Sequence, residues 1–192
     1  MEYTQFLEKR RDLIAKVVYD GYRKLKLDRS KTNTNGQQSL TDLINSGETH
    51  QMEFKATLRT NLHTNLKDPK MEFSVIRTIA GFLNTHGGIL TIGVFDDGTP
   101  AGTEVDGFEN EDKMTLHLVN LIKHQLGTIN MSFIHIHFDD YQNKRVMVVE
   151  CSTAVKPVYM KDGENQRFFI RTGPSTTELS TKDAIEYMKQ RF

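Results

Sequence analysis

Apolar side chains recur every three or four positions over residues 4–27, which predicts one amphipathic helix within residues 1–27. Such a stripe is most often a packing surface, although an assembly helix, or the end of a larger upstream domain, would have the same pattern. Residues 28–38, DRSKTNTNGQQ, contain no apolar side chain and predict a polar linker. We therefore place a domain boundary there and expect residues 39–192 to fold separately.

Beyond the linker, the periodicity changes repeatedly between that of a strand and that of a helix. Strands are predicted at residues 51–58, 89–95, 133–138, 145–151, 158–160 and 167–171. Helices are predicted at residues 39–45, 71–84, 111–125 and 181–191. The run Ile89–Phe95 is apolar throughout, which is typical of a central strand covered on both faces. This order predicts an α/β (α+β) fold, in which helices flank a mixed, largely antiparallel sheet.

The composition excludes several classes of protein. Lys plus Arg and Asp plus Glu both number 25, so a surface that binds nucleic acid has to be a local patch rather than a basic coat. The single cysteine, Cys151, excludes an internal disulfide framework and a four-cysteine zinc site, and it fits a reducing compartment. No apolar run reaches the ~20 residues that span a bilayer, and the N-terminus lacks the apolar core of a signal peptide. We expect a soluble, cytoplasmic protein with no membrane partner.

Three acidic residues and a lysine suggest metal-assisted chemistry on phosphodiesters. Glu53 and Lys55 alternate in the first strand of the domain and therefore share a face. Glu48 precedes that strand and Asp96 follows the apolar strand, so the three carboxylates would converge if the two strands pair. Their oxygens would hold Mg²⁺ or Mn²⁺, and Lys55 would steady the attacking water or the phosphate. The alternative is an ordinary solvated ion pair beside an Asp-Gly turn.

Basic and hydroxyl-bearing residues suggest a surface for a phosphate backbone. Arg171 ends a predicted strand and runs into a Gly-Pro loop, where a guanidinium, hydroxyls and backbone N–H groups would form an anion site. The alternative is a plain turn before the last helix. The residues expected to contact nucleic acid are Lys55, Arg59, Lys67, Lys70, Arg77, Arg171, Ser175 and Thr176.

Other residues with reactive side chains are interpreted as structural. His135 and His137 alternate on one face of a strand and can bind a metal ion, but no third ligand is evident nearby, so a solvated sheet face is favoured. Cys151 is interpreted as a small buried residue. The chain lacks the G-x-x-x-x-G-K-[ST] phosphate loop and the G-x-S-x-G elbow, which disfavours a P-loop ATPase and an α/β-hydrolase.

Four motifs, taken in order, resemble the Schlafen AlbA-like domain. They are Glu48 with Glu53-Phe54-Lys55, the segment AGFLNTHGG at 80–88, the segment IGVFDDG at 92–98, and the closing segment from Pro157 to Thr176. The resemblance covers roughly residues 42–191 and implies nucleic-acid binding. It also implies similarity to metal-dependent endoribonucleases that cut tRNA and rRNA, whose three-carboxylate site matches Glu48, Glu53 and Asp96.

The chain also departs from the nucleases that it resembles. Those enzymes clasp RNA between two related lobes and contain a structural zinc site of cysteines and histidine, whereas this chain has one lobe and only Cys151. A homodimer would restore the groove, and a monomeric mass by light scattering would contradict that expectation. Two alternatives to the nuclease stay open. One is a non-catalytic DNA- or RNA-binding module of a larger regulatory or defence protein, and the other is a nucleotide (ATP)-binding regulatory domain.

Overall fold

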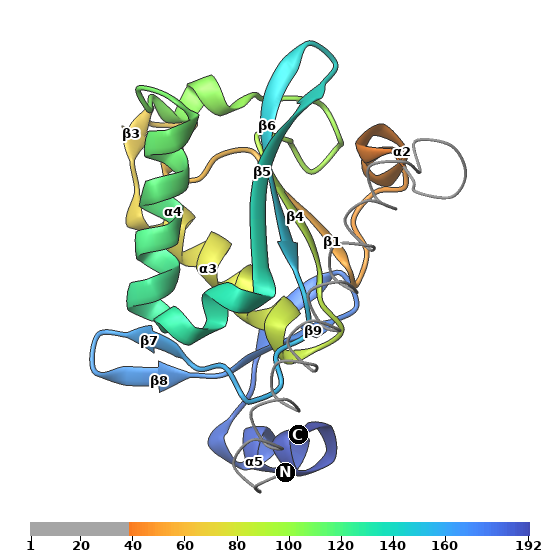
Figure 1. Ribbon diagram of the computed structural model, residues 1–192, viewed down its shortest axis with the longest axis vertical. Helices are drawn as coiled ribbons and strands as arrows, with labels where there is room; N and C mark the ends of the chain where they lie inside the picture. The colour runs from red at the N-terminus through yellow and green to blue at the C-terminus, as the bar shows by residue number, and fades with distance from the viewer. Residues whose placement is uncertain (1–38) are drawn as a thin grey trace, which may run out of the picture. The chain divides into compact units, whose positions relative to one another are not determined.

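The computed structural model describes residues 39–192, of which Leu40–Phe192 form one compact unit (Figure 1). The helix predicted within residues 1–27 and the linker predicted at 28–38 lie outside the described residues. Across residues 39–192, every helix is too short or too polar to cross a membrane.

A four-stranded mixed sheet forms the centre of the unit. Its strands are β1 (Met52–Lys55), β4 (Gly88–Ile92), β5 (Ile134–Tyr141) and β6 (Lys144–Cys151). They lie in the order β1-β4-β6-β5, parallel between β1 and β4 and antiparallel between the other neighbours. The β5–β6 hairpin turns at Gln142 and Asn143, which both have positive φ, a conformation that asparagine tolerates well. The fold class predicted from the sequence is confirmed.

Two long helices, α3 (Pro69–Asn84) and α4 (Glu111–Gln125), lie on one face of the sheet (Figure 1). Their apolar residues pack against the inward side chains of β4, β5 and β6 and form the main core. The helix predicted at 71–84 begins two residues earlier, because Asp68 caps it and Pro69 takes the first helical position. The bounds predicted for the second helix agree with the structure.

The opposite face of the sheet carries a second core at one end. The short helix α2 (Leu40–Asn45) places Ile44 against this face. There Ile44 belongs to one buried cluster with Phe54 of β1, Val148 of β6 and Tyr141 of β5. Helices α3 and α4 therefore pack against one face of the sheet, and α2 packs against one end of the other face.

Two hairpins and a helix complete the chain. They are β7 (Met160–Asp162) with β8 (Asn165–Arg167), β9 (Phe169–Thr172) with β10 (Ser175–Glu178), and α5 (Thr181–Arg191). The strand predicted at 158–160 lies two residues later, as β7, and the strand predicted at 167–171 divides between the two hairpins. The Gly-Pro loop predicted after Arg171 is a tight turn at Gly173 (φ 64°), and the hydroxyl-bearing residues that follow form β10.

Smaller differences shape the surface near the ends of β1 and β4. The strand predicted to reach Phe95 stops at Ile92, because Gly93 has φ 102°, which takes the backbone out of the strand conformation. The strand predicted at 51–58 is likewise shorter. A small hairpin, β2 (Thr60–Asn61) with β3 (Leu66–Lys67), lies in residues 57–70, whose polar, Asn-rich sequence by itself suggests a flexible loop. Two 3₁₀ turns, η1 (Thr103–Asp106) and η2 (Thr128–Phe133), precede α4 and β5 respectively.

Candidate functional site

Strand β1 presents Glu53 and Lys55 on one face and buries Phe54 on the other, as their alternation predicts. The ammonium Nζ of Lys55 lies 2.5 Å from Oε1 of Glu53. The second carboxylate oxygen, Oε2, accepts a hydrogen bond of 2.7 Å from Nη1 of Arg171. Both oxygens of Glu53 are therefore bonded to cations within the protein.

Arg171 is the buried centre of this cluster, with 1% of its side chain exposed. Its Nη2 donates to the carbonyl of Thr49 at 2.7 Å, and Nη1 also donates to the hydroxyl of Thr176 at 3.1 Å. The guanidinium lies 4.8 Å from the centre of the Phe82 ring. These contacts tie the β9–β10 hairpin to β1 and α3. Of the residues predicted to contact phosphate, Arg171 and Thr176 bond to each other, and Ser175 is exposed.

Glu48 and Asp96 lie near this cluster. A tight turn before β1 brings Glu48 back beside the strand, where its Oε1 accepts a hydrogen bond of 2.9 Å from the N–H of Phe54. Burial raises the pKa of Glu48, the Phe54 bond opposes that rise, and the charges of Glu53 and Asp96 add to it. Asp96 is exposed in the loop after β4. The three carboxylates therefore influence one another electrostatically, as their predicted convergence requires.

The positions of these three acids do not fit a divalent ion, however. Oxygens that share one Mg²⁺ or Mn²⁺ lie about 3 Å apart. In the part of the chain that the structure describes, Glu48, Glu53 and Asp96 do not bring three ligand atoms within 4.8 Å of one another. Glu53 is also occupied by Lys55 and Arg171. No catalytic step is therefore assigned to a metal ion here.

The raised pKa of Glu48 predicts a pH-dependent effect of the substitution Glu48→Gln. A carboxyl group with a higher pKa in the folded chain stabilises the fold below its unfolded pKa, and it loses that contribution as the pH rises through the folded pKa. The neutral amide keeps an acceptor for Phe54, so we expect Glu48→Gln to increase the free energy of unfolding at pH 7. The gain should vanish below about pH 4. Urea unfolding at both pH values measures this, and a variant less stable than wild type at pH 7 would contradict it.

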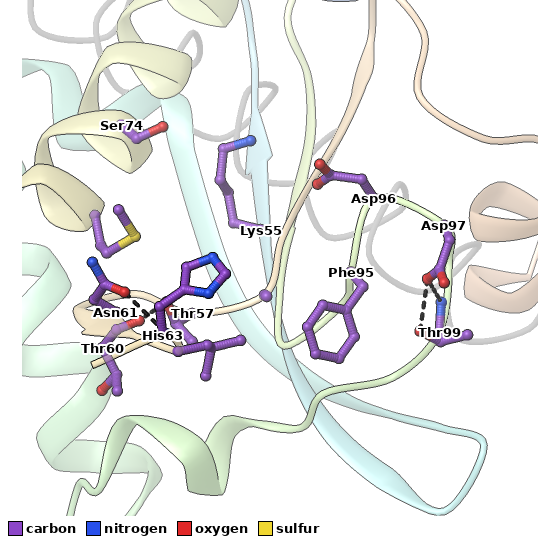
Figure 2. A pocket seen from close by; sticks show the side chains of 13 residues that line it. Lys55, Thr57, Thr60, Asn61, His63, Ser74, Phe95, Asp96, Asp97 and Thr99 are labelled. Atoms are coloured by element: carbon purple, nitrogen blue, oxygen red, sulfur yellow. Dashed lines mark hydrogen bonds between the residues drawn. The ribbon is translucent and has the colours of Figure 1, made fainter. Parts of the chain in front are cut away.

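A pocket of about 860 Å³ opens beside Lys55 at the ends of β1 and β4 (Figure 2). Its walls are the segment after β1, the β2–β3 hairpin, the first half of α3 and the loop after β4. The carboxyl ends of adjacent parallel strands are a common place for ligands in α/β sheets. The hydroxyl and amide groups that line the pocket belong to Thr57, Thr60, Asn61, Ser74 and Thr99.

Lys55 extends between Ser74 and Asp96 in this pocket (Figure 2). Phe95 lines the same pocket and leaves 39% of its surface exposed. The sequence pattern placed Phe95 at the end of a buried strand, so this aromatic wall was missed. Its only signal in the sequence is the glycine at position 93, which breaks the strand two residues before it.

The other cations of the predicted binding surface differ in their availability. Arg59 donates to the backbone carbonyls of Asp106 and Gly107, and its guanidinium stacks 3.5 Å from the centre of the Phe108 ring. Arg77 is half-buried on α3. Lys67 on β3 and Lys70 in the first turn of α3 are exposed, and neither lines the pocket. Lys67 is paired with Thr60 of the lining, and Lys70 precedes Met71 of the lining.

Asp106 holds the segment after β1 in place, although nothing local in the sequence marks it. Its buried carboxylate accepts three backbone hydrogen bonds, from Leu58 at 2.6 Å and from Arg59 and Thr60 at 2.9 Å each. These donors lie 46 to 48 residues away in the chain. The shape of the pocket wall at Thr57 and Thr60 therefore depends on a distant side chain.

Comparison with protein families gives a match over most of these elements. A family model described as Schlafen, AlbA_2 matches residues 48–180, which is more than half of the chain. The chain belongs to this family. The match confirms the resemblance based on the sequence motifs, and it spans Glu48, Glu53, Asp96 and Arg171. The pocket of this Schlafen AlbA_2 domain also lies within the matched residues.

Solved structures resemble the Schlafen AlbA_2 domain at low sequence identity. The DIP2311 protein from Corynebacterium diphtheriae is 17% identical, with a TM-score of 0.52, over 89% of this chain and 33% of that chain. This chain therefore spans about a third of the DIP2311 chain, and the likeness supports the fold alone. The N-terminal domain of a RecG-related protein from Nitrosomonas europaea is 21% identical, with a TM-score of 0.48, over 70% of this chain and 88% of that chain. No curated protein matches the chain.

Proposed function

We propose that this Schlafen AlbA_2 domain binds a nucleic acid strand, with an unpaired base in the pocket and the adjoining phosphates beside Lys55, Lys67 and Lys70. One observation carries the proposal. A single open pocket of about 860 Å³ combines an exposed aromatic ring, a lysine, and several hydroxyl and amide groups. Membership of the family supports a function related to nucleic acids.

The groups of the pocket suit a base that has left its stack. Phe95 offers a ring face, and stacking of a base on an aromatic side chain contributes about 1–3 kcal/mol. Asp96 accepts hydrogen bonds, which suits the amino groups on base edges or the 2′-hydroxyl of RNA. Thr60 and Ser74 supply further hydroxyls, whereas the side chains of Thr57 and Asn61 already bond within the protein. Duplex nucleic acid exposes no free base face, so the proposal favours single strands, loops and ends.

The charges around the pocket suit a small number of phosphates. The pocket itself is lined by Lys55 together with Asp96 and Asp97. The other cations for phosphates therefore lie outside its lining, at Lys67 beside Thr60 and at Lys70 beside Met71. The chain carries no net charge, so its attraction for a polyanion has to come from this local group. Three phosphate contacts on a single strand give a slope of about −2 for the logarithm of the affinity against the logarithm of the salt concentration.

We propose that this arrangement binds without cleavage. Hydrolysis with Mg²⁺ or Mn²⁺ at Glu48, Glu53 and Asp96 would require Glu53 to leave both Lys55 and Arg171. Incubation of the protein with tRNA, ribosomal RNA and single-stranded DNA, in Mn²⁺ and in EDTA, should leave every substrate intact. Cleavage that needs Mn²⁺ and is lost in Asp96→Asn would contradict this part of the proposal. The homodimer expected from the sequence stays a prediction.

Replacement of the pocket residues should weaken binding. We expect Phe95→Ala to lower the affinity for a fluorescent single-stranded oligonucleotide about tenfold, because a stacking contact is lost. Lys55→Gln should lower it by a similar factor and reduce the slope against salt by about 0.7, because one phosphate contact is lost. Fluorescence anisotropy with RNA and DNA of the same sequence measures both effects and identifies the preferred sugar.

The matched control is Lys123→Gln, which removes an exposed lysine of α4 that does not line the pocket. Lys55 bonds to Glu53, so each variant is first compared with wild type by thermal unfolding. Phe95 is partly exposed, and its loss tests the pocket without touching that ion pair. Equal affinities for wild type, Phe95→Ala and Lys55→Gln would overturn the proposal. Displacement of the oligonucleotide by an equal concentration of ATP would favour the nucleotide-binding alternative.

A further inference from the structure

A separate cluster of two histidines and a glutamate lies on the β5–β6 hairpin. His135 and His137 alternate along β5, and Glu150 of β6 is the direct cross-strand partner of His135. Ile134 and Ile136, which alternate with the histidines, pack toward α3 and α4, so the cluster lies on the opposite face of the sheet. Ligand atoms of His135, His137 and Glu150 all lie within 4.8 Å of one another. The sequence suggested the two histidines, and the third ligand is supplied by strand pairing.

The types of donor atom indicate which ion would bind. Two imidazole nitrogens and one carboxylate oxygen suit Zn²⁺ and related transition metals, whereas Mg²⁺ prefers oxygen ligands alone. Nitrogen and oxygen ligands 2.0–2.1 Å from a tetrahedral ion lie about 3.3 Å apart. The ligand atoms therefore need to approach one another by no more than about 1.5 Å, which side-chain rotation provides. The stacked rings of His135 and His137, with centroids 5.3 Å apart, already face in similar directions.

The ligand atoms of this cluster are available to bind an ion, whereas both carboxylate oxygens of Glu53 already bond to Lys55 and Arg171. His135 is exposed, and His137 and Glu150 are half-buried. Within residues 39–192, no lysine or arginine forms an ion pair with Glu150. The Nδ1 atom of His137 is buried and has no hydrogen-bond partner among the described residues. A buried polar nitrogen without a partner is uncommon, and a neighbouring ion or water molecule would satisfy the ring.

We propose that His135, His137 and Glu150 bind one Zn²⁺-type ion on the face of the β5–β6 hairpin opposite α3 and α4, with solvent in the fourth position. The site would bind its ion independently of the nucleic-acid pocket, because none of the three residues lines that pocket. Three protein ligands with an open fourth position leave the ion able to accept a further ligand, such as a carboxylate or imidazole of another molecule.

Isothermal titration of the full chain with ZnCl₂ tests the proposal. We expect one saturable site per chain with Zn²⁺ and none with Mg²⁺. His135→Gln and Glu150→Gln should each weaken Zn²⁺ binding about tenfold or more, because each removes a ligand. Binding should also weaken between pH 7 and pH 5.5, because protons compete for the imidazoles. A crystal grown with Zn²⁺ should give an anomalous peak between the three side chains.

The control is His124→Gln, which removes an exposed histidine of α4 outside the cluster. It should bind Zn²⁺ as wild type does, and all variants should show the same unfolding transition in EDTA. The absence of saturable binding to the wild-type chain would overturn the proposal. Equal affinities in wild type, His135→Gln and Glu150→Gln would overturn it as well, because the ion would then bind elsewhere.

Discussion

Substitution of Arg171 by methionine is expected to reduce the free energy of unfolding by about 3–5 kcal/mol, the usual cost of breaking a buried ion pair. Arg171 bonds to Glu53, to the carbonyl of Thr49 and to the hydroxyl of Thr176, so its loss leaves several buried polar groups without a partner. The effect should be larger than for any exposed pair, because water cannot replace the missing guanidinium. Urea unfolding of the two proteins at pH 7 measures the difference.

The matched control is Lys144→Met, because Lys144 forms a similar contact with Glu104 on the surface, where the two side chains are 43% and 55% exposed. That substitution should cost less than about 1 kcal/mol. A double variant, Glu53→Gln with Arg171→Met, should be less destabilised than the sum of the two single variants, because the charges compensate each other. If Arg171→Met reduced the free energy of unfolding no more than Lys144→Met does, the result would contradict the buried position of the Arg171–Glu53 pair.

Substitution of Asp106 by alanine is expected to cost about 3 kcal/mol or more and to weaken ligand binding as well. The carboxylate accepts the backbone N–H groups of Leu58, Arg59 and Thr60, and a buried donor that loses its acceptor costs about 1–3 kcal/mol. The same segment forms one wall of the pocket at Thr57 and Thr60. Urea unfolding measures the stability of the variant, and fluorescence anisotropy measures its affinity for an oligonucleotide.

Glu109→Ala serves as the control for this experiment, because it removes an exposed acid three residues further along the same loop. Its stability should stay within about 0.5 kcal/mol of wild type, which is typical of surface substitutions. If the Asp106→Ala protein were destabilised and still bound an oligonucleotide as tightly as wild type does, the result would contradict the expectation that the segment held by Asp106 contributes to binding.

The parts of the fold that could be predicted from the sequence are those fixed by local signals. The bounds of α4 and α5 agree with the structure, because each helix combines a regular apolar stripe with a side-chain cap, at Asn110 and Ser180. The two strands of the β5–β6 hairpin were also predicted, because residues 133–138 alternate between apolar and polar side chains and residues 145–151 form an apolar run. Capping, periodicity and turn chemistry act within a few residues, so a single sequence is sufficient to recognise them.

The parts that could not be predicted depend on contacts between distant residues. The sequence indicated that Glu53 and Arg171 carry important charges, but only the fold brings together two residues 118 positions apart. Their mutual ion pair gives both a structural role that the sequence did not indicate, as a buried link between β1 and β9. Glu150 could not be assigned to the two histidines for the same reason, because the register of β5 on β6 decides which residue lies opposite His135.

The structure therefore separates charges that hold the domain together from charges that remain available. Glu53 and Arg171 belong to the first group, and Arg59 joins them through Asp106, Gly107 and Phe108. Lys67 and Lys70 belong to the second group and lie next to lining residues of the pocket, Thr60 and Met71. Loss of function at Glu53, Arg171 or Arg59 would follow from unfolding. Lys55 both lines the pocket and bonds to Glu53, so its variant tests function only after its stability has been compared with wild type.

The central claim, that nucleic acid enters the pocket beside Phe95, is tested most directly by photochemical cross-linking. A short single-stranded oligonucleotide that contains one 5-iodouracil is bound to the protein, irradiated, and the modified peptide is identified by mass spectrometry. We expect the adduct on the peptide that contains Phe95, and its loss in Phe95→Ala, because the base stacks on that ring. Adducts confined to α4 or α5, unchanged in Phe95→Ala, would contradict the account.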